Sequence, residues 1–213
     1  MTDPVTLHGY RFSVYTRIAR VVLAEKGVLY TRSEIDPFAG DLPDGYLRLH
    51  PFARVPVLTH GAFALYETGA IARYVDAAFD GPKMVPTRPE ALARMAQVIA
   101  IVDNYGYIPM IRQVFAHRVF LPLHGGPTDE AEVAAGIAVS PTILKALEDI
   151  AKEGLVLNGE EITLADCHLG PMMDYFTAAP EGAEMINAFR YLHAWWAWMS
   201  PRPAMITSDP GRG

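Results

Sequence analysis

Three short strings in the first third of the chain contain residue types that could bind different parts of one small peptide. Residues 13–17 read Ser-Val-Tyr-Thr-Arg, residues 51–58 read Pro-Phe-Ala-Arg-Val-Pro-Val-Leu, and residues 67–71 read Glu-Thr-Gly-Ala-Ile. We interpret the first string as a partner for a thiol, the second as a partner for a peptide backbone, and the third as a partner for an α-carboxylate.

Ser13 lies between an apolar run that predicts a strand and an amphipathic run that predicts a helix from about Thr16. The unpaired N–H groups and positive dipole end of a helix lower the pKa of a thiol placed there. Residues 13–16 contain no Cys, so dithiol chemistry by the chain itself is excluded at this junction. The Ser13 hydroxyl could instead donate a hydrogen bond to the thiolate of a ligand. Spacing alone favours a simpler role as a helix cap.

Val55 and Pro56 open a strand after a loop, which makes their peptide bond a candidate for the cis isomer. A cis bond would turn the Val55 N–H and C=O outward, where an extended peptide could pair with them. An ordinary proline at the edge of a sheet is the simpler interpretation.

Glu67 and Thr68 immediately precede a helical pattern and are candidates for helix caps. They could equally hold a zwitterion. The Thr68 hydroxyl and the helix N–H groups would bind its carboxylate, and Glu67 would bind its ammonium group.

Hydrophobic patterning predicts the elements that position these strings. Gly27 is well placed to end the first helix, and His60-Gly61 marks the turn of a hairpin. The order is strand, helix, strand, short irregular helix, hairpin and helix, over residues 5–7, 16–26, 28–35, 41–50, 57–65 and 71–79. This βαβαββα order is typical of an α+β thioredoxin-like domain.

Residues 81–87 are rich in proline and glycine, and we interpret them as a linker between residues 1–80 and residues 88–200. The second segment reads as an all-α domain. Within it, Pro141 predicts a kink or a new helix start, and residues 163–166 have the polar positions of a capping box. Residues 201–213 are expected to form an irregular tail.

Composition narrows the class of protein. The 213 residues are 51% hydrophobic, enough for a real core, and the net charge of −6 with no long basic run argues against nucleic-acid and anionic-membrane partners. Cys167 is the single cysteine, and we interpret it as buried and inert. No secretory signal, membrane-spanning run or metal-ligand spacing is visible, so we expect a cytoplasmic protein without a metal.

Taken together, the strings resemble the soluble glutathione transferases. Residues 13–17, 51–58 and 65–74 follow the order of that family's N-terminal motifs, and residues 162–166 resemble its helical-domain signature. The resemblance covers roughly residues 4–200 and is closest to the serine-using phi class and its theta and zeta relatives. It implies a cytosolic homodimeric enzyme of detoxification. Such an enzyme conjugates the thiolate of glutathione, its only cosubstrate, to a small apolar electrophile.

By this resemblance, Ser13 is the thiol-activating hydroxyl, with Tyr10 and Tyr15 as the alternatives. The electrophile would sit against the helical domain. Its predicted pocket is formed by aromatic and methionine side chains, namely Phe12, Tyr105, Met110 and Phe115.

The resemblance also assigns the remaining glutathione contacts. The backbone of Val55 would pair with the cysteinyl part of glutathione, ahead of a cis Pro56. Glu67 and Thr68 would hold the γ-glutamyl end, and Arg54 could reach a carboxylate.

The chain departs from the phi-like pattern where a basic pair is common. Residues 41–44 read Asp-Leu-Pro-Asp, which leaves the glycyl carboxylate without a predicted partner. Arg48 and His50 are the nearest basic side chains in the sequence. Phe52 is a candidate anchor for the homodimer interface, and a core position is its alternative.

Two other functions stay open from the sequence. One is a noncatalytic protein of this fold that binds apolar ligands or acts as an interaction domain. The other is a glutathione-dependent isomerase, lyase or peroxidase that uses the same site, because a fold does not fix a reaction.

Overall fold

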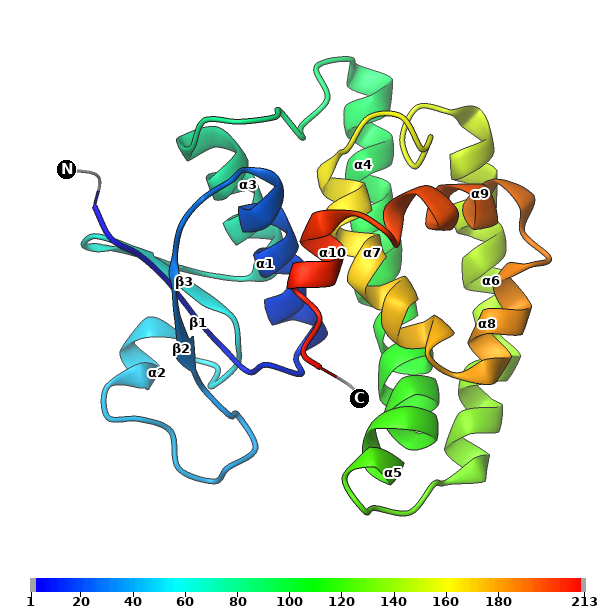
Figure 1. Ribbon diagram of the computed structural model, residues 1–213, viewed down its shortest axis with the longest axis horizontal. Coiled ribbons are helices and arrows are strands. Elements are labelled where there is room, and N and C mark those ends of the chain that lie inside the picture. The colour runs from blue at the N-terminus through cyan, green and yellow to red at the C-terminus, as the bar shows by residue number, and fades with distance from the viewer. Residues whose placement is uncertain (1–2, 212–213) are drawn as a thin grey trace. The chain divides into compact units, whose positions relative to one another are not determined.

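The computed structural model describes residues 3–211, which divide into two compact units (Figure 1). One unit contains residues 3–83 together with residues 207–211, and the other contains residues 84–206. Residues 207–211 therefore belong to the unit in which the chain begins.

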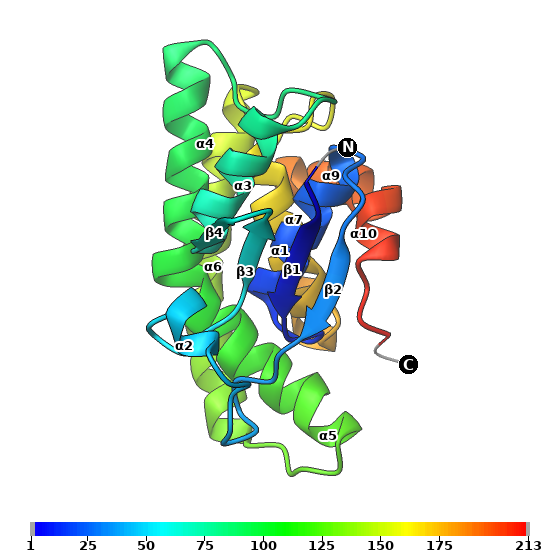
Figure 2. The ribbon, with the colours of Figure 1, turned by 90° about the vertical axis from the view of Figure 1, so that its left-hand side faces the viewer.

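The first unit is built on a four-stranded mixed sheet. Its strands are β1 (Val5–Gly9), β2 (Thr31–Glu34), β3 (Val57–His60) and β4 (Phe63–Tyr66). They lie in the order β2-β1-β3-β4, as Figure 2 shows. β1 pairs parallel with β2 and antiparallel with β3, and β3 pairs antiparallel with β4.

Helices cover both faces of this sheet. Helices α1 (Val14–Glu25) and α3 (Thr68–Ala78) lie on one side, and the short helix α2 (Tyr46–Leu49) lies on the other (Figure 1). Leu7 and Leu58 are opposite each other in the register and are buried. On the α2 side, Val57 packs with Ile35 and Tyr46 in a second buried cluster. Each sheet face is thus tied to the helices by its own apolar residues.

Two boundaries in this unit differ from the sequence-based expectation. Helix α1 begins at Val14, because Ser13 is its N-cap. Strand β2 is shorter than the predicted residues 28–35, since Leu29 is 93% exposed and contributes nothing to the core. Gly27 has φ 67° just beyond the helix, a left-handed conformation that favours glycine and ends α1 as predicted.

The second unit is helical. In chain order its elements are α4 (Pro89–Ile101), η1 (Val102–Phe120), α5 (Leu121–Leu123), α6 (Glu130–Glu153), α7 (Leu164–Thr177), α8 (Pro180–Ile186), α9 (Arg190–Met199) and α10 (Pro203–Thr207). Helix α7 is the centre of the unit, because nearly all of its side chains are buried. η1 is a π-helix that continues directly from α4 and contains Pro109.

Two expectations about the helical unit change. Helix α6 runs through Pro141, so the alternative of a new helix start there is wrong, and the alternative of a kink stays a prediction. The Ser140 hydroxyl donates to the carbonyl of Gly136 at 2.8 Å. The segment 201–213 was expected to be irregular but contains α10, where Ala204 and Met205 are buried. Apolar burial therefore holds a short helix despite the flanking prolines.

Other local predictions are confirmed. The capping box is present, with the Thr163 N–H donating to Asp166 Oδ2 at 2.7 Å. Cys167 is buried, with its Sγ 3.7 Å from the sulfur of Met84.

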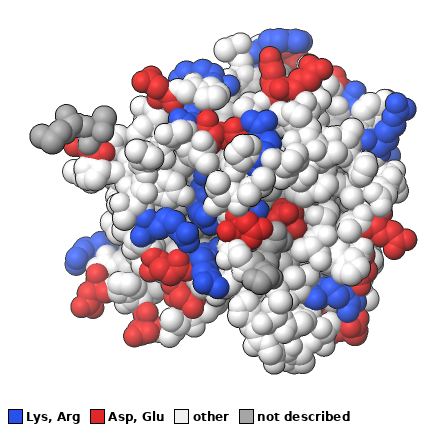
Figure 3. Space-filling model, in the orientation of Figure 1, with Lys and Arg blue, Asp and Glu red and all other residues white. Residues whose placement is uncertain are grey.

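Within residues 3–211, no helix is long and apolar enough to span a membrane. Acidic and basic side chains are interspersed over the face shown in Figure 3.

Candidate active site

Strand register brings the three strings to one edge of the sheet. His8, near the end of β1, pairs with Val57 at the start of β3, and Val57 pairs with Tyr66 at the end of β4. Ser13 follows β1, residues 54–56 lead into β3, and Glu67 follows β4, so all three strings leave the sheet at this edge. Neighbouring strands are about 4.8 Å apart, so β1 and β4 are separated by about 10 Å, the reach of an extended tripeptide.

Ser13 acts as the N-cap of α1. Its backbone is extended, with φ −68° and ψ 121°, and its Oγ accepts a hydrogen bond from the Thr16 N–H at 3.2 Å. Accepting this bond uses a lone pair and leaves the hydroxyl proton able to donate. The capping role and the thiol-binding role are therefore compatible in the same side chain.

An aromatic group flanks Ser13 within the sheet unit. The ring of Tyr10 makes edge contacts with Phe12 at 5.6 Å and with Phe38 at 6.2 Å, and the Arg11 guanidinium lies 4.3 Å from the Phe12 ring centre. Burial raises the pKa of the Tyr10 phenol, and nearby acidic side chains raise it further. Phe38 is 71% exposed and was not predicted, since nothing local in the sequence links it to Tyr10.

The second string has the backbone geometry that the sequence suggested. The Val55–Pro56 peptide bond is cis, as predicted. Arg54 is exposed, Val55 is partly buried and Pro56 is buried. The chain thus passes from solvent into the core over these three residues.

The third string begins with a strained residue. Glu67 is the N-cap of α3 and has φ 70° and ψ 117°, a conformation that costs a non-glycine residue about 1–3 kcal/mol. The Glu67 side chain makes no capping hydrogen bond to this helix, and the Ile71 N–H donates to the Glu67 carbonyl at 2.9 Å. The N–H groups of the first turn are therefore available to an anion, beside the buried Thr68.

The predicted electrophile residues fall in different environments. Phe12 lies in the sheet unit and is partly buried, whereas Tyr105 lies on η1 of the helical unit and is 66% exposed. Met110 and Phe115, also on η1, are buried, and Phe115 stacks on Tyr175 with ring centres 4.3 Å apart. The last two pack within the helical unit, and their role in an electrophile pocket stays a prediction.

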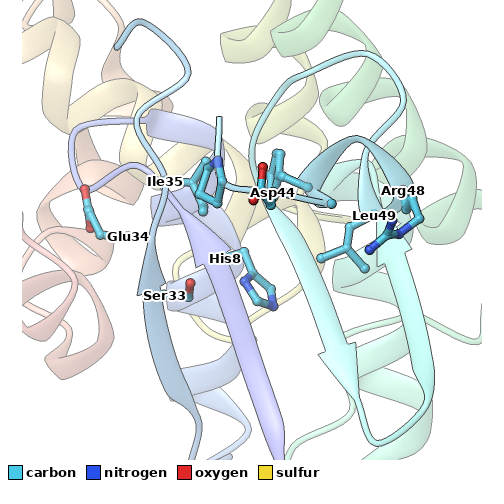
Figure 4. Close-up of a pocket in the computed structure, with 10 residues that line it drawn as sticks. His8, Ser33, Glu34, Ile35, Asp44, Arg48 and Leu49 are labelled. Carbon is cyan, nitrogen blue, oxygen red and sulfur yellow. The ribbon is translucent and has the colours of Figure 1, made fainter. Parts of the chain in front are cut away.

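Arg48 and His50 are the basic residues nearest to the position where the phi-like pattern has a basic pair. His50 is buried and tilted against Tyr66, with ring centres 4.7 Å apart, and burial lowers its pKa. Arg48 lines a hollow of about 420 Å³ (Figure 4), formed by His8, Ser33, Glu34, Ile35, Pro43, Asp44, Gly45, Tyr46, Arg48 and Leu49. None of these lining residues is a predicted glutathione ligand. Among residues 3–211, no three metal-ligating side chains gather into a site.

Comparisons with known proteins agree with this fold. The family models for the N-terminal and C-terminal domains of glutathione S-transferase match residues 7–83 and 107–203. Glutathione S-transferase F10 of Arabidopsis thaliana is 29% identical over 204 residues, 94% of each chain. The chain belongs to the glutathione S-transferase family and is an enzyme of that class. Its predicted fold class, a thioredoxin-like domain followed by a helical domain, is confirmed.

Two solved structures are similar over nearly the whole chain. Glutathione transferase F2 from Populus trichocarpa has a TM-score of 0.85 at 25% identity, covering 98% of this chain and 99% of that chain. A theta-class glutathione S-transferase from Xanthomonas axonopodis pv. citri, solved with glutathione bound, has a TM-score of 0.78 at 27% identity, covering 97% of both chains. The fold is therefore shared with a relative whose structure contains the tripeptide.

Proposed function

We propose that this enzyme conjugates glutathione to a small apolar electrophile, with the Ser13 hydroxyl stabilising the glutathione thiolate. The observation that carries the proposal is the meeting of three strings at one sheet edge, across a distance that suits an extended tripeptide. Each string offers a group that matches one part of glutathione. Ser13 offers a hydroxyl, Val55 offers backbone N–H and C=O groups, and Glu67 precedes an uncapped helix end.

In this proposal the γ-glutamyl end binds at the start of α3. Its α-carboxylate accepts hydrogen bonds from the first-turn N–H groups and from Thr68, and its ammonium group pairs with the exposed Glu67 carboxylate. The strained backbone of Glu67 supports this role, because such conformations persist at binding sites where neighbouring structure holds them.

The thiol end binds at the start of α1. The helix dipole and the Ser13 hydroxyl both stabilise a thiolate over a thiol, and each unit of pKa depression corresponds to about 1.4 kcal/mol. The aromatic group formed by Tyr10, Phe12 and Phe38 offers the apolar surface against which an electrophile would lie. The reaction then gains from holding the thiolate beside its acceptor.

The remaining partners are also part of the proposal. Arg54, which is exposed beside Val55, is the candidate for a glutathione carboxylate. Phe52 is 66% exposed, which excludes the alternative of a core position and leaves its role as a homodimer anchor a prediction. A cytoplasmic location is likewise expected from the sequence.

The test is a comparison of Ser13→Ala with the wild-type enzyme. We expect the pKa of bound glutathione, followed by thiolate absorbance, to rise by about one unit or more, because one charge-assisted hydrogen bond is lost. Turnover with an aryl-halide electrophile should fall at least about tenfold at neutral pH. Ser13→Thr, which keeps a hydroxyl, should retain part of the pKa depression and part of the turnover.

Tyr10→Phe and Tyr15→Phe are the matched controls, since each removes one competing hydroxyl. Unchanged thiolate absorbance and turnover in Ser13→Ala, with a loss in either tyrosine variant, would move the role to that tyrosine. Glutathione binding without turnover of any electrophile would favour the noncatalytic alternative.

A further inference from the structure

The phenol of Tyr46 donates a hydrogen bond of 2.7 Å to the backbone carbonyl of Arg54. Tyr46 begins α2, on the opposite side of the sheet from α1 and α3, and Arg54 immediately precedes Val55. We propose that Tyr46 is a positioning residue for glutathione. Without touching the ligand, it fixes the backbone segment that pairs with the cysteinyl part of the tripeptide. The inference rests on the proposed function and concerns the same site.

The donor is held rigidly. Tyr46 is 3% exposed and packs in the buried cluster with Ile35 and Val57, against which Val55 and Tyr66 also pack. Burial raises the pKa of the Tyr46 phenol to about 12, so it keeps its proton and stays a donor at neutral pH. A buried and fully protonated phenol therefore offers one fixed direction for the Arg54 carbonyl.

The bond closes a loop whose middle is also anchored, since Leu49 packs against the buried cluster and His50 is buried against Tyr66. Between the two ends of the loop the chain makes tight turns, with the His50 N–H donating to the Tyr46 carbonyl and the Ala53 N–H donating to the His50 carbonyl, each at 3.0 Å. Leu47 and Phe52, which lie on this loop, are 58% and 66% exposed and add little apolar burial. The partly buried Tyr46–Arg54 bond thus fixes the last residue of the loop, directly before Val55.

Val55 lies between two fixed points. On one side the Arg54 carbonyl is held by Tyr46, and on the other Val57 is buried in the same cluster as Tyr46. These two constraints together set the directions of the Val55 N–H and C=O groups. A peptide ligand that pairs with Val55 forms hydrogen bonds with its backbone N–H and C=O groups. A small displacement of these groups therefore weakens binding. Ser13 is the N-cap of α1 and takes no part in the Tyr46–Arg54 hydrogen bond, so stabilisation of the thiolate should not change.

The experiment compares Tyr46→Phe with the wild-type enzyme at full length. The variant keeps the ring in the cluster and removes only the hydroxyl. We expect the dissociation constant for glutathione, measured by calorimetric titration, to rise about five- to tenfold, as the loss of one hydrogen bond predicts. The acid dissociation constant of the bound thiol and kcat at saturating glutathione should each stay within about twofold of wild type.

Tyr66→Phe is the matched control, because Tyr66 is a tyrosine that packs against the same cluster. It should leave glutathione affinity within about twofold of wild type. The inference is overturned if Tyr46→Phe binds glutathione like wild type, if its kcat and thiol pKa change along with affinity, or if Tyr66→Phe weakens binding equally. A wild-type enzyme that does not bind glutathione would refute the proposed function instead, and with it the basis of this inference.

Discussion

The indole N–H of Trp195 donates a hydrogen bond of 2.7 Å to Oδ1 of Asp166, the carboxylate whose other oxygen caps α7. Both side chains are buried at the centre of the helical unit. Burial raises the pKa of the Asp166 carboxyl, and the hydrogen bonds from Thr163 and Trp195 oppose that rise. One carboxylate thus joins the start of α7 to α9.

Replacing Trp195 with Phe should destabilise the helical unit. The change removes one donor from a fully buried carboxylate and leaves a small cavity, and we expect a loss of about 2–4 kcal/mol in the free energy of unfolding. Urea denaturation followed by circular dichroism measures it. Trp196→Phe is the control, because Trp196 is only partly buried. Equal losses in the two variants would contradict a special role for the Asp166 bond.

The C-terminal segment should stabilise the sheet unit. The guanidinium of Arg20, buried on α1, donates to the carbonyls of Ser208 and Thr207 at 2.7 and 2.9 Å, and Arg17 donates to the Ser208 hydroxyl at 3.3 Å. Deleting residues 207–213 leaves these buried cations without those acceptors. We expect a loss of about 3 kcal/mol or more in the free energy of unfolding, and faster hydrogen exchange in α1.

Deletion of residues 210–213 alone is the control for this truncation. It keeps the acceptors at Thr207 and Ser208, so stability should change by no more than about 0.5 kcal/mol. If the short and long deletions had the same effect, the arginine contacts would not explain the stability of the segment.

These contacts mark the limit of what the sequence could predict. The Ser13 cap, the Gly27 helix stop and the Thr163–Asp166 capping box were predictable because each depends on residues within a few positions of one another. The Tyr46–Arg54 bond spans only eight positions, yet it joins side chain to backbone across an irregular loop and leaves no periodic signal.

Contacts across longer separations were out of reach for a different reason. Arg20 meets Ser208 across 188 positions, and Trp195 meets Asp166 across 29. Patterning identifies which side chains are buried, but it does not say which buried polar groups pair. The same is true of the site, where the strings were visible but their common edge follows only from the register of β1, β3 and β4.

Stability should fall as pH falls below neutrality, in part because of His50. Burial, the largest cause, lowers the pKa of this imidazole, while Glu67 acts against the shift and Arg54 adds to it. The unfolded chain takes up a proton near the ordinary His pKa of about 6.5, and the folded chain does so only at lower pH. The unfolding free energy attributable to His50 is therefore complete above that pKa and is lost below it.

His50→Asn should consequently reduce the slope of unfolding free energy against pH between about pH 7 and pH 5. The slope should not vanish, since burial also lowers the pKa of His8 and contributes with the same sign. The exposed His193 provides the control in His193→Asn. Urea denaturation at several pH values is the measurement, and an unchanged slope in His50→Asn would exclude this contribution.

Glu67 should show a trade between stability and binding. Its backbone conformation, with φ 70°, suits glycine, so Glu67→Gly should relieve strain and raise the free energy of unfolding by about 1 kcal/mol. The same change removes the carboxylate proposed to pair with the glutathione ammonium group, so affinity should fall about tenfold.

Glu67→Gln separates the two effects, because it keeps the strain and removes the charge. We expect it to match wild type in stability and Glu67→Gly in affinity. If Glu67→Gly instead bound glutathione as tightly as wild type, the residue would be strained for a reason other than ligand binding. If Glu67→Gln were stabilised to the same degree, the cost at this position would come from the charge and not from the backbone.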